Sequence, residues 1–313
     1  MKEILLLLVM FWNVENFFDT YDNPSTNDEE FTPMGENRWS WKRFEKKRDD
    51  IAKTILLAAD SYGEYPAIIG LCEVENRFVL EELAENTPLA RVGYSILHKD
   101  SPDNRGIDVA LLYREEVFTP LKEEYIACSF PTRDILYTKG VINGLDTVHI
   151  LVNHWPSKRG GENSSSMKRM LVSHTVRHVT DSILATNSNA NIIMMGDFND
   201  TYTTRPLENL EPLVNLSGWA TGHEGTYKYR EEWNIIDQFL VSGNLLQREA
   251  AEGEFTRQWI YCKKEMEIFA PDNLLCPDDT YMGVKLKRTF IGPRYAGGVS
   301  DHLPILLKLH VEE

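Results

Sequence analysis

Short runs of apolar residues, rich in β-branched side chains, recur along the chain and are bounded by polar or turn-forming residues. Runs of this length and composition are typical of buried strands. Apolar residues follow one another without strict alternation, so we expect both faces of these strands to be covered. The expected strands are 5–12, 67–72, 107–113, 148–153, 191–195, 235–241 and 304–309.

Helical spacing of apolar residues appears between some of these runs. Segments 41–58 and 167–183 follow a period close to 3.6 residues, and 78–83 predicts a third, shorter helix. A serine-rich start at 164–166 is expected to cap the second helix. Helices between the early strands, and strand pairs in the middle of the chain, indicate a mixed α/β or α+β fold. No linker divides the chain, so we expect one domain over residues 1–313.

The composition permits a large core but carries a strong acidic excess. The 313 residues are 42% hydrophobic, with 33 Lys and Arg against 48 Asp and Glu, for a formal net charge of −15. Such a charge disfavours a protein that holds nucleic acid by bulk attraction. It is compatible with an enzyme that gathers carboxylates around a metal ion.

The N-terminal apolar run, 4–12, is far shorter than the roughly 20 residues that span a bilayer. No small-residue cleavage site follows it, so we favour a buried strand and a cytoplasmic location over an export signal remnant in residues 1–10. The cysteines form no C-x-x-C pair, and free thiols are expected. Pairing of Cys262 with Cys276 is the alternative if the protein is exported.

Polar residues concentrate where the expected strands begin or end. In open sheets, catalytic side chains gather where strand ends meet. Asn, Glu, His and Asp at six such ends suit a hard divalent metal with acid–base groups. The segments are N-V-E-N at 13–16, E-V-E-N at 73–76, N-H-W-P at 153–156, G-D-F-N-D at 196–200, I-D at 236–237 and S-D-H at 300–302.

This set of motifs, in this order, resembles the endonuclease/exonuclease/phosphatase superfamily of deoxyribonuclease-like metal-dependent phosphohydrolases, and its bacterial members most of all. The similarity runs from Asn13 to His302, nearly the whole chain. It implies a four-layer αββα sandwich, with two packed mixed β-sheets flanked by helices. It also implies one catalytic domain over 1–313, with its site at one edge of the two sheets.

The resemblance implies a Mg²⁺ site, with Mn²⁺ as a substitute. Glu73 matches the glutamate that binds the ion, and Asn13 the asparagine that holds the metal-site network and the phosphate. Asp301 and Glu15 extend the expected ligand set, although Glu15 could equally be a solvated side chain. Carboxylate oxygens are the ligands Mg²⁺ prefers.

The catalytic groups follow from the same resemblance. Asp197 is expected to position or deprotonate the attacking water, and Asn199 to bind phosphate. Asp237 is expected to fix the tautomer of His302. His154 matches a second histidine that donates to the phosphate or to the leaving oxygen.

Two rival interpretations are excluded by the positions of their residues. An EF-hand beginning at Asp197 would need glycine where Tyr202 stands. A protease-like triad of residues 300–302 is excluded because neighbours on an extended segment point to opposite faces.

Basic residues supply weaker candidates. Arg77 and Arg105 could bind phosphate bidentately or simply be solvated. The locally basic stretch 157–177 could guide an anionic substrate, and the aromatic and basic segment 39–48 could line a nucleic-acid groove. Helical spacing suits 39–48 to a core-facing stripe equally well.

We therefore expect a Mg²⁺-dependent hydrolase of phosphodiester bonds that uses in-line attack of activated water, with DNA or RNA as the leading substrate. The alternatives are a phosphatase or phosphodiesterase for a lipid headgroup, an inositol phosphate or another small phosphoester, and a catalytically inactive binding module. No transmembrane segment and no protein partner are implied, and a monomer is expected.

Overall fold

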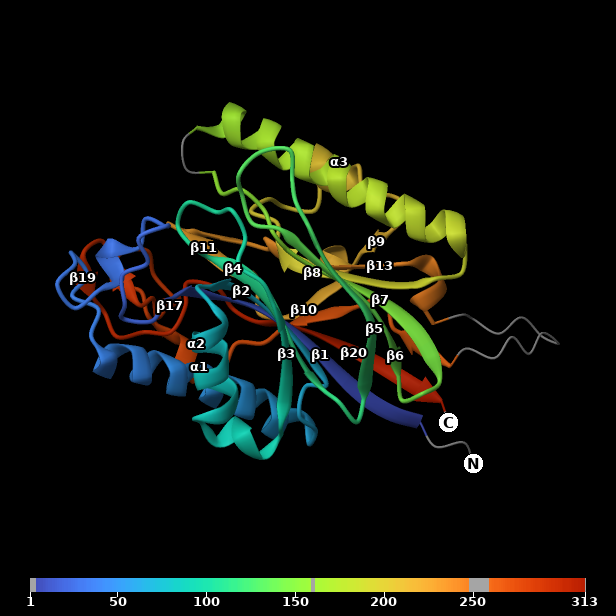
Figure 1. The fold of residues 1–313 in the computed structure, drawn as a ribbon, viewed down its shortest axis with the longest axis horizontal. Helices are drawn as coiled ribbons and strands as arrows, with labels where there is room; N and C mark the ends of the chain where they lie inside the picture. The colour runs from blue at the N-terminus through green and yellow to red at the C-terminus, as the bar shows by residue number, and fades with distance from the viewer. Residues whose placement is uncertain (1–3, 159–160, 248–258, 313) are drawn as a thin grey trace.

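The computed structural model describes residues 4–158, 161–247 and 259–312. Within these ranges the strands form an eight-stranded sheet, a six-stranded sheet and three two-stranded sheets. Helices α1 (Trp41–Tyr62) and α2 (Arg77–Glu85) cover the outer face of the larger sheet, and α3 (Glu162–Thr186) covers the other sheet (Figure 1). The predicted four-layer αββα sandwich is therefore confirmed.

The larger sheet is built around β1 (Ile4–Phe17), which pairs antiparallel with β20 (Ile305–Glu312) and parallel with β2 (Ile68–Val74). Its order is β10-β15-β20-β1-β2-β4-β3, with β14 also paired to β20. The remaining strands are β3 (Tyr94–His98), β4 (Asp108–Arg114), β10 (Ala220–Gly222), β14 (Ile260–Cys262) and β15 (Met266–Ile268). Residues 7–12 of β1 are buried because both faces of this sheet are covered.

The second sheet has the order β5-β6-β7-β8-β13-β9, and β7 and β8 are its parallel pair. Its strands are β5 (Phe118–Ile126), β6 (Ile135–Ile142), β7 (Asp146–His154), β8 (Asn191–Asp197), β9 (Val214–Asn215) and β13 (Asp237–Val241). The small sheets pair β11 (Tyr227–Tyr229) with β12 (Glu232–Asn234), β16 (Leu275–Pro277) with β17 (Val284–Leu286), and β18 (Phe290–Ile291) with β19 (Arg294–Tyr295). Short helices are α4 (Arg205–Glu208) and the 3-10 turns Glu29–Phe31, Pro88–Arg91, Leu216–Trp219, Gly243–Leu245 and Asp272–Leu274.

All seven expected strands and all three expected helices are present, with shifted ends. The serine cap is wrong: α3 begins at Glu162 with Gly161 as its N-cap, so serines 164–166 lie inside the helix. Strand β5 was not expected, because it is an edge strand whose central residues 121–124 are exposed and carry no apolar run.

The N-terminal run forms β1, as expected for a buried strand. All four cysteines are free thiols. Among the described residues, no helix combines the length and the apolar character needed to cross a membrane.

Candidate active site

Bulges in β1 and β2 place the first site residues. Asn13 pairs with Cys72, but the next paired residue of β1 is Phe17, opposite Val74. Glu15, Asn16 and Glu73 all adopt positive φ angles, of 48°, 54° and 61°. Left-handed conformations are uncommon for residues other than glycine and are concentrated at functional sites. A bulge redirects side chains out of the regular alternation, and here it turns these groups toward one sheet edge.

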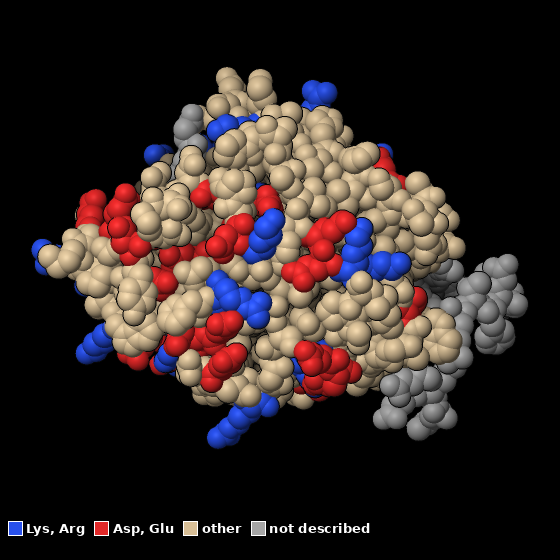
Figure 2. All heavy atoms as spheres, viewed as in Figure 1, with Lys and Arg blue, Asp and Glu red and all other residues tan. Residues whose placement is uncertain are grey.

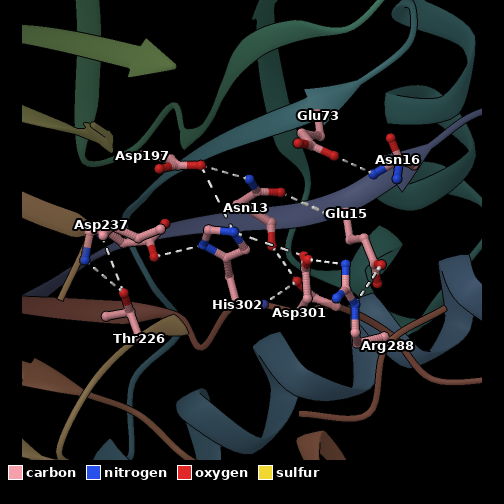
Figure 3. Close-up of polar contacts among 12 residues, drawn as sticks. Asn13, Glu15, Asn16, Glu73, Asp197, Thr226, Asp237, Arg288, Asp301 and His302 are labelled. Carbon is pink, nitrogen blue, oxygen red and sulfur yellow. Dashed lines mark hydrogen bonds and ion pairs between the residues drawn. The ribbon is translucent and has the colours of Figure 1, made fainter. Parts of the chain in front are cut away.

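Glu73 lies in a small network with residues of two other segments. Its Oε2 accepts a hydrogen bond from the Asn16 backbone N–H at 2.9 Å (Figure 3). Arg105 donates to the side-chain oxygen of Asn16, and its Nη2 lies 3.9 Å from Glu73 Oε2. The structure thus brings Arg105 close to Glu73, and its contact with a phosphate stays a prediction.

Asp197 is fixed by two asparagines. Asn13 Nδ2 donates to Asp197 Oδ2 at 3.0 Å (Figure 3). The Asn199 backbone N–H donates to Asp197 Oδ1 at 2.8 Å. Gly196, just before it, leaves room for the neighbouring strand, since a Cβ there would lie 2.5 Å from the Asn153 carbonyl oxygen. Burial raises the pKa of Asp197 to about 7, although the charge of His302 opposes the shift.

His302 is held by Asp237. Its Nδ1 lies 2.8 Å from Asp237 Oδ2, and Thr226 Oγ1 accepts the Asp237 backbone N–H at 3.2 Å (Figure 3). Burial alone would lower the pKa of His302, but the carboxylates of Asp237 and Asp197 outweigh burial and raise it well above the usual value. His302 Nε2 lies 3.9 Å from Asp197 Oδ2, so the imidazole faces the carboxylate.

His154 faces the same centre from the end of β7. Its Nε2 lies 3.8 Å from Glu73 Oε1 and 3.7 Å from Asp197 Oδ2. Burial lowers the pKa of His154 well below the usual value, and the charges of Arg133 and Arg105 lower it further. The surroundings therefore shift the pKa values of the two histidines in opposite directions.

Glu15 and Asp301 form a second acidic group, bridged by Arg288. Arg288 Nη2 lies 2.6 Å from Asp301 Oδ2, and Nε lies 3.5 Å from Glu15 Oε1 (Figure 3). The Thr289 backbone N–H donates to Glu15 Oε2 at 2.7 Å. Burial and the charge of Asp301 raise the pKa of Glu15 to about 7.

The donor set suits a hard divalent cation, because it offers the carboxylate oxygens that Mg²⁺ prefers. Glu73 accepts no hydrogen bond from a charged group among the described residues, since Arg105 Nη2 and His154 Nε2 lie 3.9 and 3.8 Å from its carboxylate oxygens. Both polar atoms of the Asn13 side chain are in hydrogen bonds. Glu15 and Asp301 face Arg288 instead.

The other basic candidates lie elsewhere. Arg77 binds Glu81 and the carbonyl oxygen of Ile96, which holds it to α2 and β3. In 157–177, Lys158 and Arg169 both lie near the single carboxylate of Asp200, and Arg177 pairs with Asp181. Positions 159 and 160 of this stretch lie outside the described residues. In the 39–48 segment, Trp39 and Lys47 are buried, and Lys46 and Arg48 pair with Asp50 and Glu82, which agrees with the core-facing stripe.

Three residues that support the site were not predicted from the sequence. Arg288 stands in a Gly- and Pro-containing loop, where an arginine is ordinarily solvated. Lys47 is 1% exposed, and its Nζ donates to Thr289 Oγ1 and the Val299 carbonyl oxygen, both at 2.6 Å. Its place between Phe44 and Ile51 on the apolar face of α1 could have revealed it. Arg133 Nη2 donates to the Trp155 carbonyl oxygen at 2.8 Å and so supports the end of β7.

A two-sheet sandwich with carboxylates, amides and a histidine–aspartate pair at one edge defines the class of metal-dependent phosphoester hydrolases. A sequence profile described as the Endonuclease/Exonuclease/phosphatase family matches residues 8–311, and the chain belongs to this family. Members of the family are divalent-metal-dependent hydrolases that act on phosphoester bonds. No curated protein sequence matches the chain significantly.

Solved structures share the fold at low identity. A Bacteroides thetaiotaomicron protein of the same family is 14% identical with a TM-score of 0.60, over 99% of this chain and 97% of that one. A mannosyl-6-phosphatase of the same species is 15% identical with a TM-score of 0.60, over 97% and 99%. The catalytic domain of human nocturnin, solved with bound sulfate, is 16% identical with a TM-score of 0.57, over 98% of this chain and 97% of that one.

Proposed function

We propose that this protein hydrolyses a small phosphoester, using a divalent metal ion and an activated water that attacks in line. The observation that carries the proposal is the convergence of Glu73, Asp197 and His302, which come from strand ends of both sheets, at one end of the sandwich. Family membership supports the reaction class.

Asp197 is the group we assign to the water. Its carboxylate is oriented by Asn13 and Asn199, and its pKa of about 7 suits a base that works near neutral pH. A fixed carboxylate of this kind aligns water for attack and accepts its proton.

The two histidines have different tasks in this scheme. His302, charged and oriented by Asp237, would stabilise negative charge that develops on the phosphoryl oxygens. His154, neutral at the same pH, would donate a hydrogen bond to the substrate without adding charge. Asn199, whose Nδ2 lies 3.0 Å from the Trp155 carbonyl oxygen, would orient the phosphate beside Asp197.

Glu73 would hold the metal ion, close to the Asn13 side chain. A bound Mg²⁺ or Mn²⁺ would supply Lewis-acid chemistry at a phosphate oxygen. Arg105, which reaches Asn16 beside Glu73, would bind a further oxygen of the phosphate.

Charge favours a small substrate over a polynucleotide. The net charge is −15, and on the face shown in Figure 2 acidic and basic side chains are interspersed. Arg169, in the basic stretch closest to His154, is buried against Asp200 and cannot contact a backbone phosphate. A structural relative bears the name of a sugar phosphatase, which agrees with a small phosphoester.

The test is an assay with Mg²⁺ or Mn²⁺, and with EDTA, on sugar phosphates, inositol phosphates, sphingomyelin, a bis-aryl phosphodiester, plasmid DNA and RNA. We expect EDTA-sensitive release of phosphate from one small substrate. His302→Ala and Asp197→Ala should each lower kcat by about 10²–10⁴ without unfolding the protein. Near-normal rates in both variants would refute the assigned site, and efficient plasmid cleavage would redirect the substrate to nucleic acid.

A further inference from the structure

Glu15 and Asp301 form a carboxylate pair next to Glu73, and a guanidinium lies between them. Arg288 Nη2 contacts Asp301 Oδ2 at 2.6 Å, while its Nε, which is buried and without a hydrogen bond to the described residues, points toward Glu15 Oε1 at 3.5 Å (Figure 3). The Glu15 and Asp301 side chains are 5% and 14% exposed. Two carboxylates this far from water need a positive charge beside them.

The backbone around Arg288 is fixed by segments distant in the sequence. The Thr289 N–H donates to Glu15 Oε2, and Lys47 Nζ binds both Thr289 Oγ1 and the Val299 carbonyl oxygen. The Gly298 N–H donates to the Arg288 carbonyl oxygen at 3.1 Å. A Cβ at Gly298 would lie 1.9 Å from the Lys287 oxygen, so only glycine permits this approach. The fold therefore directs the Arg288 side chain toward the two carboxylates.

We propose that Arg288 is a positioning residue that stands in the place of a second divalent cation, between Glu15 and Asp301. The inference rests on the proposed function, which puts a divalent ion at Glu73. On this proposal each chain binds one divalent ion, at Glu73. The carboxylates of Glu15 and Asp301 bind the guanidinium of Arg288 and hold no ion.

A guanidinium and a Mg²⁺ ion differ in the contacts they need, and this explains why the Glu15–Asp301 pair holds the first and Glu73 the second. A guanidinium is always charged and offers several planar donors, so one side chain serves two carboxylates. Mg²⁺ needs oxygen ligands at about 2.0–2.1 Å in a near-octahedral arrangement, which a guanidinium between the carboxylates prevents. Glu73, whose contact with Arg105 is 3.9 Å long, keeps its carboxylate available.

Arg288 also links this pair to the catalytic histidine. Asp301 directly precedes His302, and the Ser300 hydroxyl donates to the Asn13 carbonyl oxygen at 2.6 Å while accepting the His302 N–H at 2.9 Å. The ion pair of Arg288 with Asp301 therefore lies directly beside the turn that presents His302.

The experiment counts bound Mn²⁺, by calorimetry and by electron paramagnetic resonance, and does not depend on turnover. We expect one Mn²⁺ per chain in the wild type and in Arg288→Lys, and two in Arg288→Met, where the carboxylates have lost their guanidinium. Arg294→Met, which removes an exposed arginine on β19, is the matched control and should bind one. Asp301→Asn should change the affinity of the single ion less than threefold, whereas Glu73→Gln should weaken it at least tenfold.

Two ions in the wild type, or one ion in folded Arg288→Met, would overturn the inference and leave the proposed function standing. If Arg288→Met does not fold, the wild-type and Asp301→Asn measurements decide, since a tenfold loss on Asp301→Asn would make Asp301 a ligand. No Mn²⁺ bound to the wild type would instead refute the metal dependence in the proposed function, and the inference would fall with it.

Discussion

Replacing Arg169 with methionine should destabilise the protein and loosen the ends of β7 and β8. The Arg169 side chain, from α3, is completely buried, and its Nε donates to Asp200 Oδ2 at 2.9 Å. Its Nη1 donates to the Pro156 carbonyl oxygen at 3.3 Å. Asp200 directly follows Asn199, and Pro156 lies two positions after His154. The Arg169 side chain therefore connects two loops of the site.

The expected loss of stability arises because the charge of Asp200 stays buried when Arg169 is removed. Two unit charges 2.9 Å apart attract by about 6 kcal/mol at an effective dielectric constant of about 20, and the desolvation of both groups offsets part of this. Removing one partner of a buried pair typically costs about 3–5 kcal/mol, because the other charge stays buried. Lys158 Nζ, 3.6 Å from Asp200 Oδ1, compensates part of that charge. We therefore expect a loss of about 3 kcal/mol in the free energy of unfolding.

Urea unfolding followed by tryptophan fluorescence measures this loss. Arg177→Met is the matched control on the same helix, because its pair with Asp181 has side chains that are 36% and 50% exposed. Exposed pairs contribute up to about 1 kcal/mol, so the control should lose no more than that. Adding Asp200→Asn to Arg169→Met should restore part of the stability. Equal losses in Arg169→Met and Arg177→Met would refute the reasoning.

Three further predictions concern the site and the pH response. Arg105→Ala should raise KM about tenfold, since a charged contact contributes about 1.5 kcal/mol, whereas Arg77→Ala should change KM less than twofold; equal effects would contradict the placement of Arg105. Chelation by EDTA should abolish activity, and added Mn²⁺ should restore it in the wild type but only weakly in Glu73→Gln; full restoration in that variant would exclude Glu73 as the ligand. Burial lowers the pKa of His149 from 6.5 to about 4 in the folded protein, so the unfolded chain binds the extra proton as the pH falls from 6.5 toward 4, and stability falls across that window. His149→Gln should therefore lose less stability than the wild type between pH 7.5 and pH 5 in urea unfolding, and an unchanged pH dependence would count against this explanation.

Local patterns predicted seven of the ten described strands that are five or more residues long, and missed β3, β5 and β6. Strands such as β1 and β8 are recognisable because hydrophobic residues follow one another wherever a strand is covered on both faces. Edge strand β5 escaped prediction for the opposite reason, since its exposed central residues look like a loop. Helix α3 was recognised from its period, but its start was not, because serines inside a helix resemble a cap in sequence.

The candidate site could be predicted only in part. Asn13, Glu73, Asp197, Asp237 and His302 stand at the ends of recognisable strands, and the structure brings them together as expected. The sequence assigned Glu15 and Asp301 to the metal but did not reveal the guanidinium between them. It also gave Arg77 and Arg105 equal weight, whereas only Arg105 reaches the Glu73 network.

By itself, the sequence determined the order of strands and helices and the polar groups at the strand ends, because both depend on residues close together in the chain. The tertiary structure decided which charged side chains are buried and which groups pair with them. Lys47, Arg169 and Arg288 are ordinary basic residues in sequence. Each is paired by a segment that packs against it from elsewhere, as with Lys47 and Thr289, which are 242 positions apart. Burial makes such charges expensive unless they are paired, and only the packing of distant segments determines which charges are buried.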